Sequence, residues 1–301
     1  MAKIAVESHG VVSRREAVGG PGRLTSRVMA QGSGWVVADT ICTAGPQDRT
    51  FEEQHSEVTI AVVLQGSFQY RGDQGRYLMT PGCLLLGNAG QYFECGHEHG
   101  VGDRCISFRF SRDYFASLAA DVDGCNANAA FKLLRLPALR ELSSLVAESR
   151  TALGGAPHGV WEELGVRIVV KALQLADGNS AGSSDPSPSS LARATRTVRM
   201  IEQNTDSKLS LGALARQAGL SPYHFLRSFQ QFTGLTPHQY VLRARLREAA
   251  VRLVSGTDRV LDVALDCGFG DVSNFNRAFR AEFGASPGAY RAKVRGLVPS
   301  R

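Results

Sequence analysis

The last third of the chain repeats itself, and this repeat restricts the possible folds more than any other feature. Eight residues recur as the same residue type, two pairs at an offset of 49 and six pairs at an offset of 50. One inserted residue near Gly270 accounts for the change. The pattern therefore predicts two copies of one structural unit. The matched pairs are Ala215/Ala264, Gly219/Gly268, Phe225/Phe275, Arg227/Arg277, Phe229/Phe279, Gly234/Gly284, Pro237/Pro287 and Tyr240/Tyr290.

The first copy has the sequence pattern of a helix-turn-helix. We expect a short helix over 211–217, followed by a turn in which Gly219 supplies a positive φ. Ser221 is a good N-cap and Pro222 a good first residue for the second helix. The two phenylalanines of that helix are four residues apart and therefore share its buried face.

The second copy follows the same plan. We expect helices over 261–266 and 272–283, with Asp271 as the N-cap of the second one. Residues 236–255 predict a connecting helix of roughly 30 Å, which is close to the 34 Å of one DNA turn. A rigid helix of this size could hold two recognition helices in successive major grooves.

Charge divides the chain unevenly. The net charge is +6, but residues 191–301 carry 17 Lys and Arg against 8 Asp and Glu, a net of +9, and the rest carries −3. A basic C-terminal part favours a nucleic-acid-binding module. The alternative is a helical array that binds protein. The positive charge, the N-cap residues and the arginine two residues after each first buried phenylalanine favour DNA.

A Ser-, Gly- and Pro-rich segment separates the two parts. Residues 177–190 have no apolar periodicity and predict a flexible linker. Residues 191–301 then form the C-terminal domain. Before the linker, residues 137–176 predict a helical hairpin, with helices over 137–153 and 160–176.

Residues 23–136 show short apolar or alternating runs between Gly and Pro turns, which predict an antiparallel barrel or sandwich. The runs are Glu57–Leu64, Ser67–Tyr70, Tyr77–Met79, Cys83–Leu86 and Cys105–Phe110.

Residues 1–22 carry little signal, so disorder is the expectation there, and they lack a secretory h-region. No apolar run is long enough for a membrane span, and six irregularly spaced cysteines predict thiols in a reducing cytoplasm.

Residues 193–295 resemble the DNA-binding domain of the AraC/XylS family of bacterial transcription regulators. The likeness lies in LSLGALARQAGLSPYHFLRSFQQFTGLTP, RARLREAAVRLV and VLDVALDCGFGDVSNFNRAFRAEFGASPGAYR. The stretch from His55 to Phe110, with VVLQGSFQY and TPGCLLLGN, resembles the cupin-like barrel found in many members. The resemblance implies a two-domain α+β protein. Its parts would be an N-terminal antiparallel β-barrel with a helical hairpin and an all-α C-terminal domain with a double helix-turn-helix.

The resemblance also implies which side chains face DNA. By position, the first recognition helix presents Tyr223, Leu226 and Arg227, and the second presents Ser273, Asn276 and Arg277. The arginines could bind guanine or phosphate, and Asn276 could read adenine or position the backbone. Leu226 departs from the polar residue often found at its position, so it could pack on a thymine methyl or be neutral. Phe269 fits the core rather than the interface.

The family likeness implies a function without catalysis. We expect a sequence-specific, double-stranded-DNA-binding transcription regulator, an activator controlled by a small-molecule effector in the barrel. The implied partners are RNA polymerase and a second copy in a homodimer. The helices over 137–176 would serve dimerisation or cap the barrel. The expected location is the bacterial cytoplasm, at the nucleoid through DNA binding.

One group of residues suggests a metal. Cys95, His97, His99 and Cys105 are a possible zinc set, although the spacing is not a standard motif, and Cys95, His97 and His99 would share one face of a strand. A metal- or thiol-responsive regulator is therefore an alternative. Core thiols beside a turn with exposed histidines are the simpler explanation, so no cofactor is expected. A cupin enzyme is disfavoured because His55 is followed by Glu57 without a second histidine.

Overall fold

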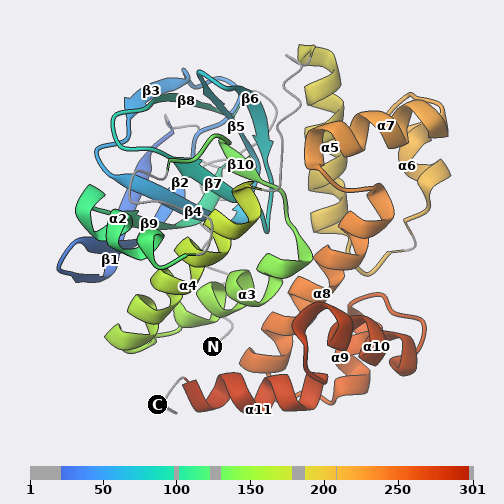
Figure 1. The fold of residues 1–301 in the computed structure, drawn as a ribbon. Coiled ribbons are helices and arrows are strands. Elements are labelled where there is room, and N and C mark those ends of the chain that lie inside the picture. The colour runs from blue at the N-terminus through green and yellow to red at the C-terminus, as the bar shows by residue number, and fades with distance from the viewer. Residues whose placement is uncertain (1–21, 98–101, 123–129, 178–186, 208, 298–301) are drawn as a thin grey trace.

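The computed structural model describes residues 22–97, 102–122, 130–177, 187–207 and 209–297. Within these residues, two antiparallel sheets with their covering helices form an N-terminal domain, and helices from Pro188 onward form a C-terminal domain (Figure 1). The fold is thus the expected two-domain α+β arrangement. Residues 1–21 and 178–186, where disorder and most of the linker were expected, lie outside the described residues.

The N-terminal domain is built from ten described strands in two sheets. The six-stranded sheet has the order β1-β2-β9-β4-β7-β10 and the four-stranded sheet the order β3-β8-β5-β6. All pairings are antiparallel, as predicted. The strands are β1 (Leu24–Gly32), β2 (Trp35–Cys42), β3 (Phe51–Gln54), β4 (Val58–Gly66), β5 (Phe68–Gly72), β6 (Gly75–Met79), β7 (Leu84–Gly87), β8 (Tyr92–Gly96), β9 (Asp103–Phe110) and β10 (Arg135–Leu136).

Strand β4 shows why both faces of the larger sheet are apolar. Ile60 and Val62 enter the core between this sheet and the helices, whereas Ala61 and Val63 enter the core between the two sheets. Alternate residues of a strand point to opposite faces, so a strand covered on both sides reads as a continuous apolar run. The run in β4 is therefore the signature of a sheet covered on both faces.

Three helices and a 3₁₀ turn accompany the sheets: α2 (Arg112–Ala120), a 3₁₀ turn (Arg140–Leu142), α3 (Ser143–Ala152) and α4 (His158–Asp177). Helix α4 matches the expected second helix of the hairpin. The first begins at Ser143 rather than Pro137, because Arg135 and Leu136 pair with β7 and a 3₁₀ turn intervenes. Both helices bury apolar residues against the larger sheet, so they cover it.

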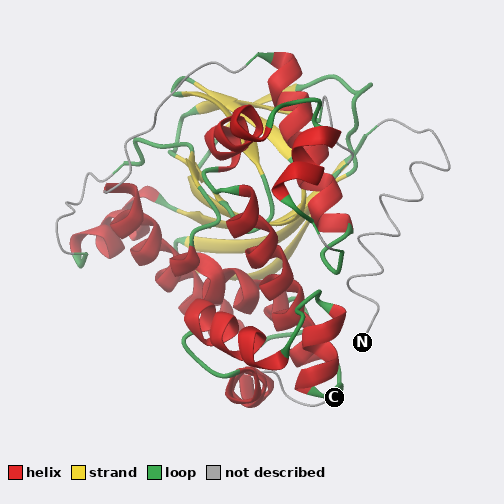
Figure 2. Ribbon diagram, turned by 90° about the vertical axis from the view of Figure 1, so that its right-hand side faces the viewer, coloured by secondary structure: helices red, strands yellow, loops and turns green. Residues whose placement is uncertain are grey.

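The C-terminal domain consists of α5 (Pro188–Gln203), α6 (Leu211–Gln217), α7 (Pro222–Thr233), α8 (Pro237–Ser255), α9 (Val260–Asp266), α10 (Val272–Phe283) and α11 (Pro287–Leu297). Figure 1 shows α8 between the group α5–α7 and the group α9–α11. Each group has its own core against α8. The turned view in Figure 2 shows the C-terminal helices next to the helices that enclose the sheets.

Helix α5 was not predicted from the sequence, and its first turn lies inside the expected linker. The Ser187 side chain accepts a hydrogen bond from the Ser190 main-chain N–H, and Pro188 is the first helical residue. Serine and proline are typical of linkers but also of helix N-termini, which explains the error. Among the described helices, none has the length and hydropathy needed to cross a membrane.

Candidate nucleic-acid interface

The two helix-turn-helix units have the same turn. Gly219 and Gly268 adopt φ values of +66° and +80°. The Leu220 N–H donates to the Ala215 carbonyl at 3.0 Å, and the Phe269 N–H donates to the Ala264 carbonyl at the same distance. Because a positive φ favours glycine, the glycine at this point of each copy is a requirement of the turn. The predicted repeat is therefore also a repeat in structure.

Both recognition helices, α7 and α10, begin at capping side chains. Ser221 accepts from the His224 N–H at 3.4 Å, and Asp271 accepts from the Asn274 N–H at 2.6 Å. Such caps satisfy main-chain donors that would otherwise be unpaired in the first turn. Both helices end at a glycine with positive φ, Gly234 and Gly284. The lengths and directions of the two recognition helices are thus fixed by the same means.

Aromatic residues anchor each recognition helix to the core. Phe229 lies edge-on to Tyr240, with ring centroids 5.6 Å apart, and Phe279 lies edge-on to Tyr290 at 5.4 Å. Phe225 and Phe275 are also buried, one turn earlier in each helix. Edge-to-face rings at this distance are favourable beyond their burial. The opposite face of each helix is thereby held toward solvent.

Five of the six residues expected to face DNA are exposed: Tyr223, Arg227, Ser273, Asn276 and Arg277. Within the described part of the chain, no carboxylate forms an ion pair with Arg227 or Arg277. Leu226 differs, because it is half-buried and lines a cleft of about 540 Å³ between the two units. Phe269 lies in the core of the second unit, as expected.

The arginines of α8 are engaged within the protein. Arg245 donates to the Thr205 and Ser207 carbonyls, and Arg247 binds Glu202 at 2.6 Å. Arg243 pairs with Glu282 and Arg252 with Glu248. Each of these side chains fixes α8 to a neighbouring element, and Arg252 also pairs with the preceding turn of α8 itself. The arginines of α8 are thus not free to bind DNA. The exposed positive charge near the recognition surface is carried by Arg227 on α7 and by Arg277 and Arg280 on α10.

Inside the barrel, His55 is buried and contacts two aromatic residues. Its Nε2 lies 2.7 Å from the Tyr70 hydroxyl, and its ring stacks on Phe93 with centroids 4.2 Å apart. Burial lowers the pKa of His55 to about 4, so the imidazole is neutral at neutral pH. A neutral histidine and a phenol form a polar pair inside the barrel.

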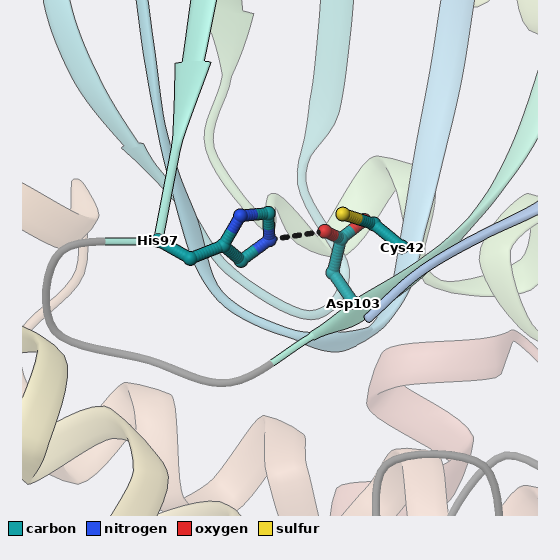
Figure 3. Close-up of side chains that lie close together, drawn as sticks. All are labelled: Cys42, His97 and Asp103. Carbon is teal, nitrogen blue, oxygen red and sulfur yellow. Dashed lines mark hydrogen bonds and ion pairs between the residues drawn. The ribbon is translucent and has the colours of Figure 1, made fainter. Parts of the chain in front are cut away.

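The residues expected to form a metal site are only partly brought together. Cys95 and Cys105 are buried in the core between the sheets, and His99 lies outside the described residues. His97 hydrogen-bonds Asp103 instead, with 2.6 Å between Nε2 and Oδ2, and Cys42 lies beside this pair (Figure 3). Cys42 and Asp103 were missed because their proximity to His97 depends on strand register, which local spacing does not show.

His97 is affected by opposing influences. Burial lowers the pKa of its imidazole, but hydrogen bonds with Asp103 and Cys42 raise the pKa by more than burial lowers it, so that it lies at about 9. Burial also raises the pKa of the Cys95 and Cys105 thiols well above the ordinary range. These two thiols are therefore protonated at neutral pH, as core thiols are.

Comparison with known proteins gives two domain matches in chain order. Residues 40–155 match the AraC-like ligand binding domain, and residues 214–293 match a helix-turn-helix domain. The first match contains β3–β10, α2 and α3, and the second contains both recognition helices.

Individual relatives are transcription regulators. The transcriptional activator NphR of a Rhodococcus species is 44% identical over 32% of this chain and 29% of its own length. YbfI of Bacillus subtilis, an uncharacterized HTH-type transcriptional regulator, is 26% identical over 73% of this chain and 79% of its own length. The regulatory protein SoxS of Salmonella typhimurium is 31% identical over 32% of this chain and 91% of its own length.

The matches differ in what they cover. The chain spans only 29% to 38% of the length of NphR, LumQ and RhaS, whose matched region is about 100 residues. It spans nine tenths of SoxS, and the two matched domains stand in the order expected for regulators of this type. With its paired helix-turn-helix units and its barrel domain, the chain belongs to the AraC/XylS family of DNA-binding transcription regulators.

Proposed function

We propose that one chain reads a DNA operator with both recognition helices at once and that an effector bound by the barrel domain controls this binding. The observation that carries the proposal is the matched placement of Arg227 and Arg277. Each follows a buried phenylalanine by two residues, and each is exposed on the recognition helix of its unit. Arginine is the residue most often used to bind guanine edges or phosphate in the major groove.

Helix α8 supports simultaneous binding by the two units. Its 19 residues span about 28 Å, somewhat less than the 34 Å of one helical turn of DNA. Arg245 and Arg247 fix α8 to the first unit, and Arg291 fixes it to the second by donating to the Leu253 carbonyl. A spacer held on both sides keeps the two recognition helices at one separation.

The six expected residues take different roles in this proposal. Arg227 and Arg277 bind guanine or phosphate, and Asn276 reads a base edge. Tyr223 and Ser273 lie in the first turn of their helices and contact the DNA backbone, where main-chain N–H groups also face an anion. Leu226 is neutral toward sequence, since it is only partly exposed and lines the cleft between the units.

The barrel domain offers an open site for an effector. A cleft of about 710 Å³ is lined by charged and aromatic side chains that include Arg71, Tyr92, Phe93 and Glu94. Phe93 also stacks on His55, so a molecule in the cleft contacts a residue that reaches the barrel interior. The lining suits a small polar molecule that carries an aromatic or apolar part.

Contacts between the domains would carry the response. Arg243 of α8 donates to the Ala138 carbonyl at 2.6 Å, and Ser143 of α3 hydrogen-bonds Glu282 at the end of α10. An effector that prefers one arrangement of these contacts would shift DNA occupancy. Within this proposal the regulator acts as an activator, as a homodimer, and in contact with RNA polymerase.

The test is selection of bound fragments from genomic DNA with the full-length chain. We expect enrichment of a common sequence with two half-sites about one helical turn apart. Binding should weaken by orders of magnitude between about 50 and 200 mM salt, because contacts to phosphates release counterions. No enrichment by a protein that is folded in circular dichroism would contradict specific DNA binding and favour a protein-interaction module.

A further inference from the structure

Three buried side chains with metal-binding chemistry converge at one end of the barrel. Cys42, His97 and Asp103 each offer one ligand atom, and these atoms lie within 4.8 Å of one another (Figure 3). All three residues are at least nine-tenths buried. A thiol, an imidazole and a carboxylate are the donors that zinc uses in proteins. Among the described residues this is the one group of the kind.

The fold places the three residues in contact from distant parts of the sequence. Cys42 ends β2 and Asp103 begins β9, and the two are direct partners in the antiparallel pairing. Directly opposite residues of such a pair point to the same face. His97 follows β8 in the other sheet, two residues after Cys95, which faces the core between the sheets. The group therefore joins the two sheets.

The geometry directs all three ligand atoms toward one point. His97 Nε2 lies 2.6 Å from Asp103 Oδ2, and Figure 3 shows the Cys42 sulfur on this same side of the imidazole ring. In a tetrahedral zinc site, nitrogen and oxygen ligands are about 3.3 Å apart. The His97–Asp103 separation would have to open by less than about 1 Å. Rotation of side chains supplies movements of this size without a change in the strands.

The charges of the group are compatible with a dication at this position. Asp103 pairs with His97 and accepts a hydrogen bond from the Cys105 thiol, but no Lys or Arg pairs with it among the described residues, whereas Asp39, on the opposite face of the sheet, binds Arg104 through both oxygens. Binding of a divalent cation releases the proton held between His97 and Asp103 and the thiol proton of Cys42, and the cation with one thiolate and one carboxylate then makes a site with no net charge. A neutral arrangement avoids the cost of an uncompensated charge in the interior.

The arrangement does not suit a nucleophilic triad. In such a triad the histidine uses one ring nitrogen for the nucleophile and the other for the carboxylate. Here the cysteine and the aspartate face the same nitrogen, and no side chain of the group is open to a substrate. A metal site, in contrast, needs ligand atoms of the cysteine and the aspartate on the same side of the histidine as its ligating nitrogen, and this arrangement is present.

We propose that Cys42, His97 and Asp103 bind one divalent, thiophilic cation of the zinc class, with a water molecule as the fourth ligand. This set shares only His97 with the set suggested by local spacing. The cation ties the start of β9 and the end of β2 to the end of β8, and so stabilises the barrel domain. The proposal does not depend on how the helix-turn-helix units act.

The experiment loads the reduced, chelator-treated full-length chain with Co²⁺ and then with Zn²⁺. We expect one Co²⁺ per chain, with a thiolate-to-cobalt charge-transfer band and visible bands of a tetrahedral ion, both lost when Zn²⁺ displaces it. Cys42→Ser should remove the charge-transfer band, and His97→Gln and Asp103→Asn should each weaken binding by about 100-fold or more. Absence of stoichiometric binding by the wild-type chain would overturn the proposal.

Controls separate this site from the other thiols. Cys83→Ser changes a buried cysteine of the same domain outside the group and should leave the cobalt spectrum unchanged. A band that persists in Cys42→Ser but is lost in Cys95→Ser would overturn the ligand set.

A second measurement uses only the wild-type chain and therefore does not depend on whether a variant folds. The chemical shift of bound ¹¹³Cd should indicate one sulfur ligand, and a shift for two or more sulfurs would contradict the assignment.

Discussion

Arg135 of the barrel domain donates a hydrogen bond to the main-chain carbonyl of Phe232, in the last turn of the first recognition helix, at 2.5 Å. The same nitrogen donates to the Leu78 carbonyl at 2.9 Å, so one guanidinium joins β6, β10 and α7. Burial lowers the pKa of Arg135, but arginine remains charged. The position of α7 thus depends on a side chain of the N-terminal domain.

Replacing Arg135 should weaken the coupling between the two domains. Arg135→Met keeps an unbranched apolar side chain but leaves two carbonyls without this donor, at a cost of about 1–3 kcal/mol. Calorimetry should show the unfolding transition of the wild type broaden or split in the variant. Arg71→Met removes an exposed arginine and should change stability by less than about 0.5 kcal/mol. An unchanged profile for Arg135→Met would contradict the coupling.

The repeat supplies a matched pair of tyrosines whose hydroxyl groups differ. The Tyr240 hydroxyl donates to Glu202 at 2.9 Å, whereas the Tyr290 hydroxyl is buried with no partner among the described residues. Tyr240→Phe should therefore lower the free energy of unfolding by about 1.5–3 kcal/mol, and Tyr290→Phe, which removes an unpaired buried hydroxyl, should leave it unchanged or raise it. Denaturant titration of both variants measures the difference. Equal losses would show that the Glu202 hydrogen bond does not distinguish the copies.

The free energy of unfolding should decrease as the pH is lowered, in a range set by His55. The folded protein resists protonation of this imidazole down to about pH 4, whereas the unfolded chain takes up the proton below 6.5. The contribution of neutral His55 is therefore complete above pH 6.5 and is lost as the pH falls toward 4, by up to about 3 kcal/mol. His55→Gln cannot titrate, so denaturant midpoints should depend less on pH in this variant. The same pH dependence in both proteins would exclude His55 as the cause.

Much of the C-terminal domain could be predicted from the sequence because its structure is determined locally. Gly219, Ser221 and Gly234 mark a turn, a cap and a helix end within 16 residues, and the second copy repeats these signals. The observed bounds of α6, α8 and α10 match the expected helices closely. Helix α5 was missed because its N-cap segment has the composition of a linker.

The barrel domain was less predictable because its strands depend on long-range pairing. Strand β1 is mostly exposed and, among the described strands, pairs only with β2, so its sequence has few apolar residues in alternation. The Cys42–Asp103 pair follows from the β2–β9 register, which no local pattern reveals. Leu226 was expected on the DNA face, and the packing of two units around α8 places it in the cleft between them.

The central claim is that both recognition helices read the same operator. The most direct measurement is the Kd of the full-length wild type, Arg227→Ala and Arg277→Ala on the selected operator, with each half-site intact or scrambled. Each variant should bind the intact operator about 5- to 150-fold more weakly than the wild type. Scrambling the half-site that the replaced arginine contacts should not change the Kd of that variant further, whereas scrambling the other half-site should still raise it. Arg49→Ala, an exposed arginine of the barrel domain, should match the wild type. Wild-type affinity in both recognition-helix variants would contradict the claim.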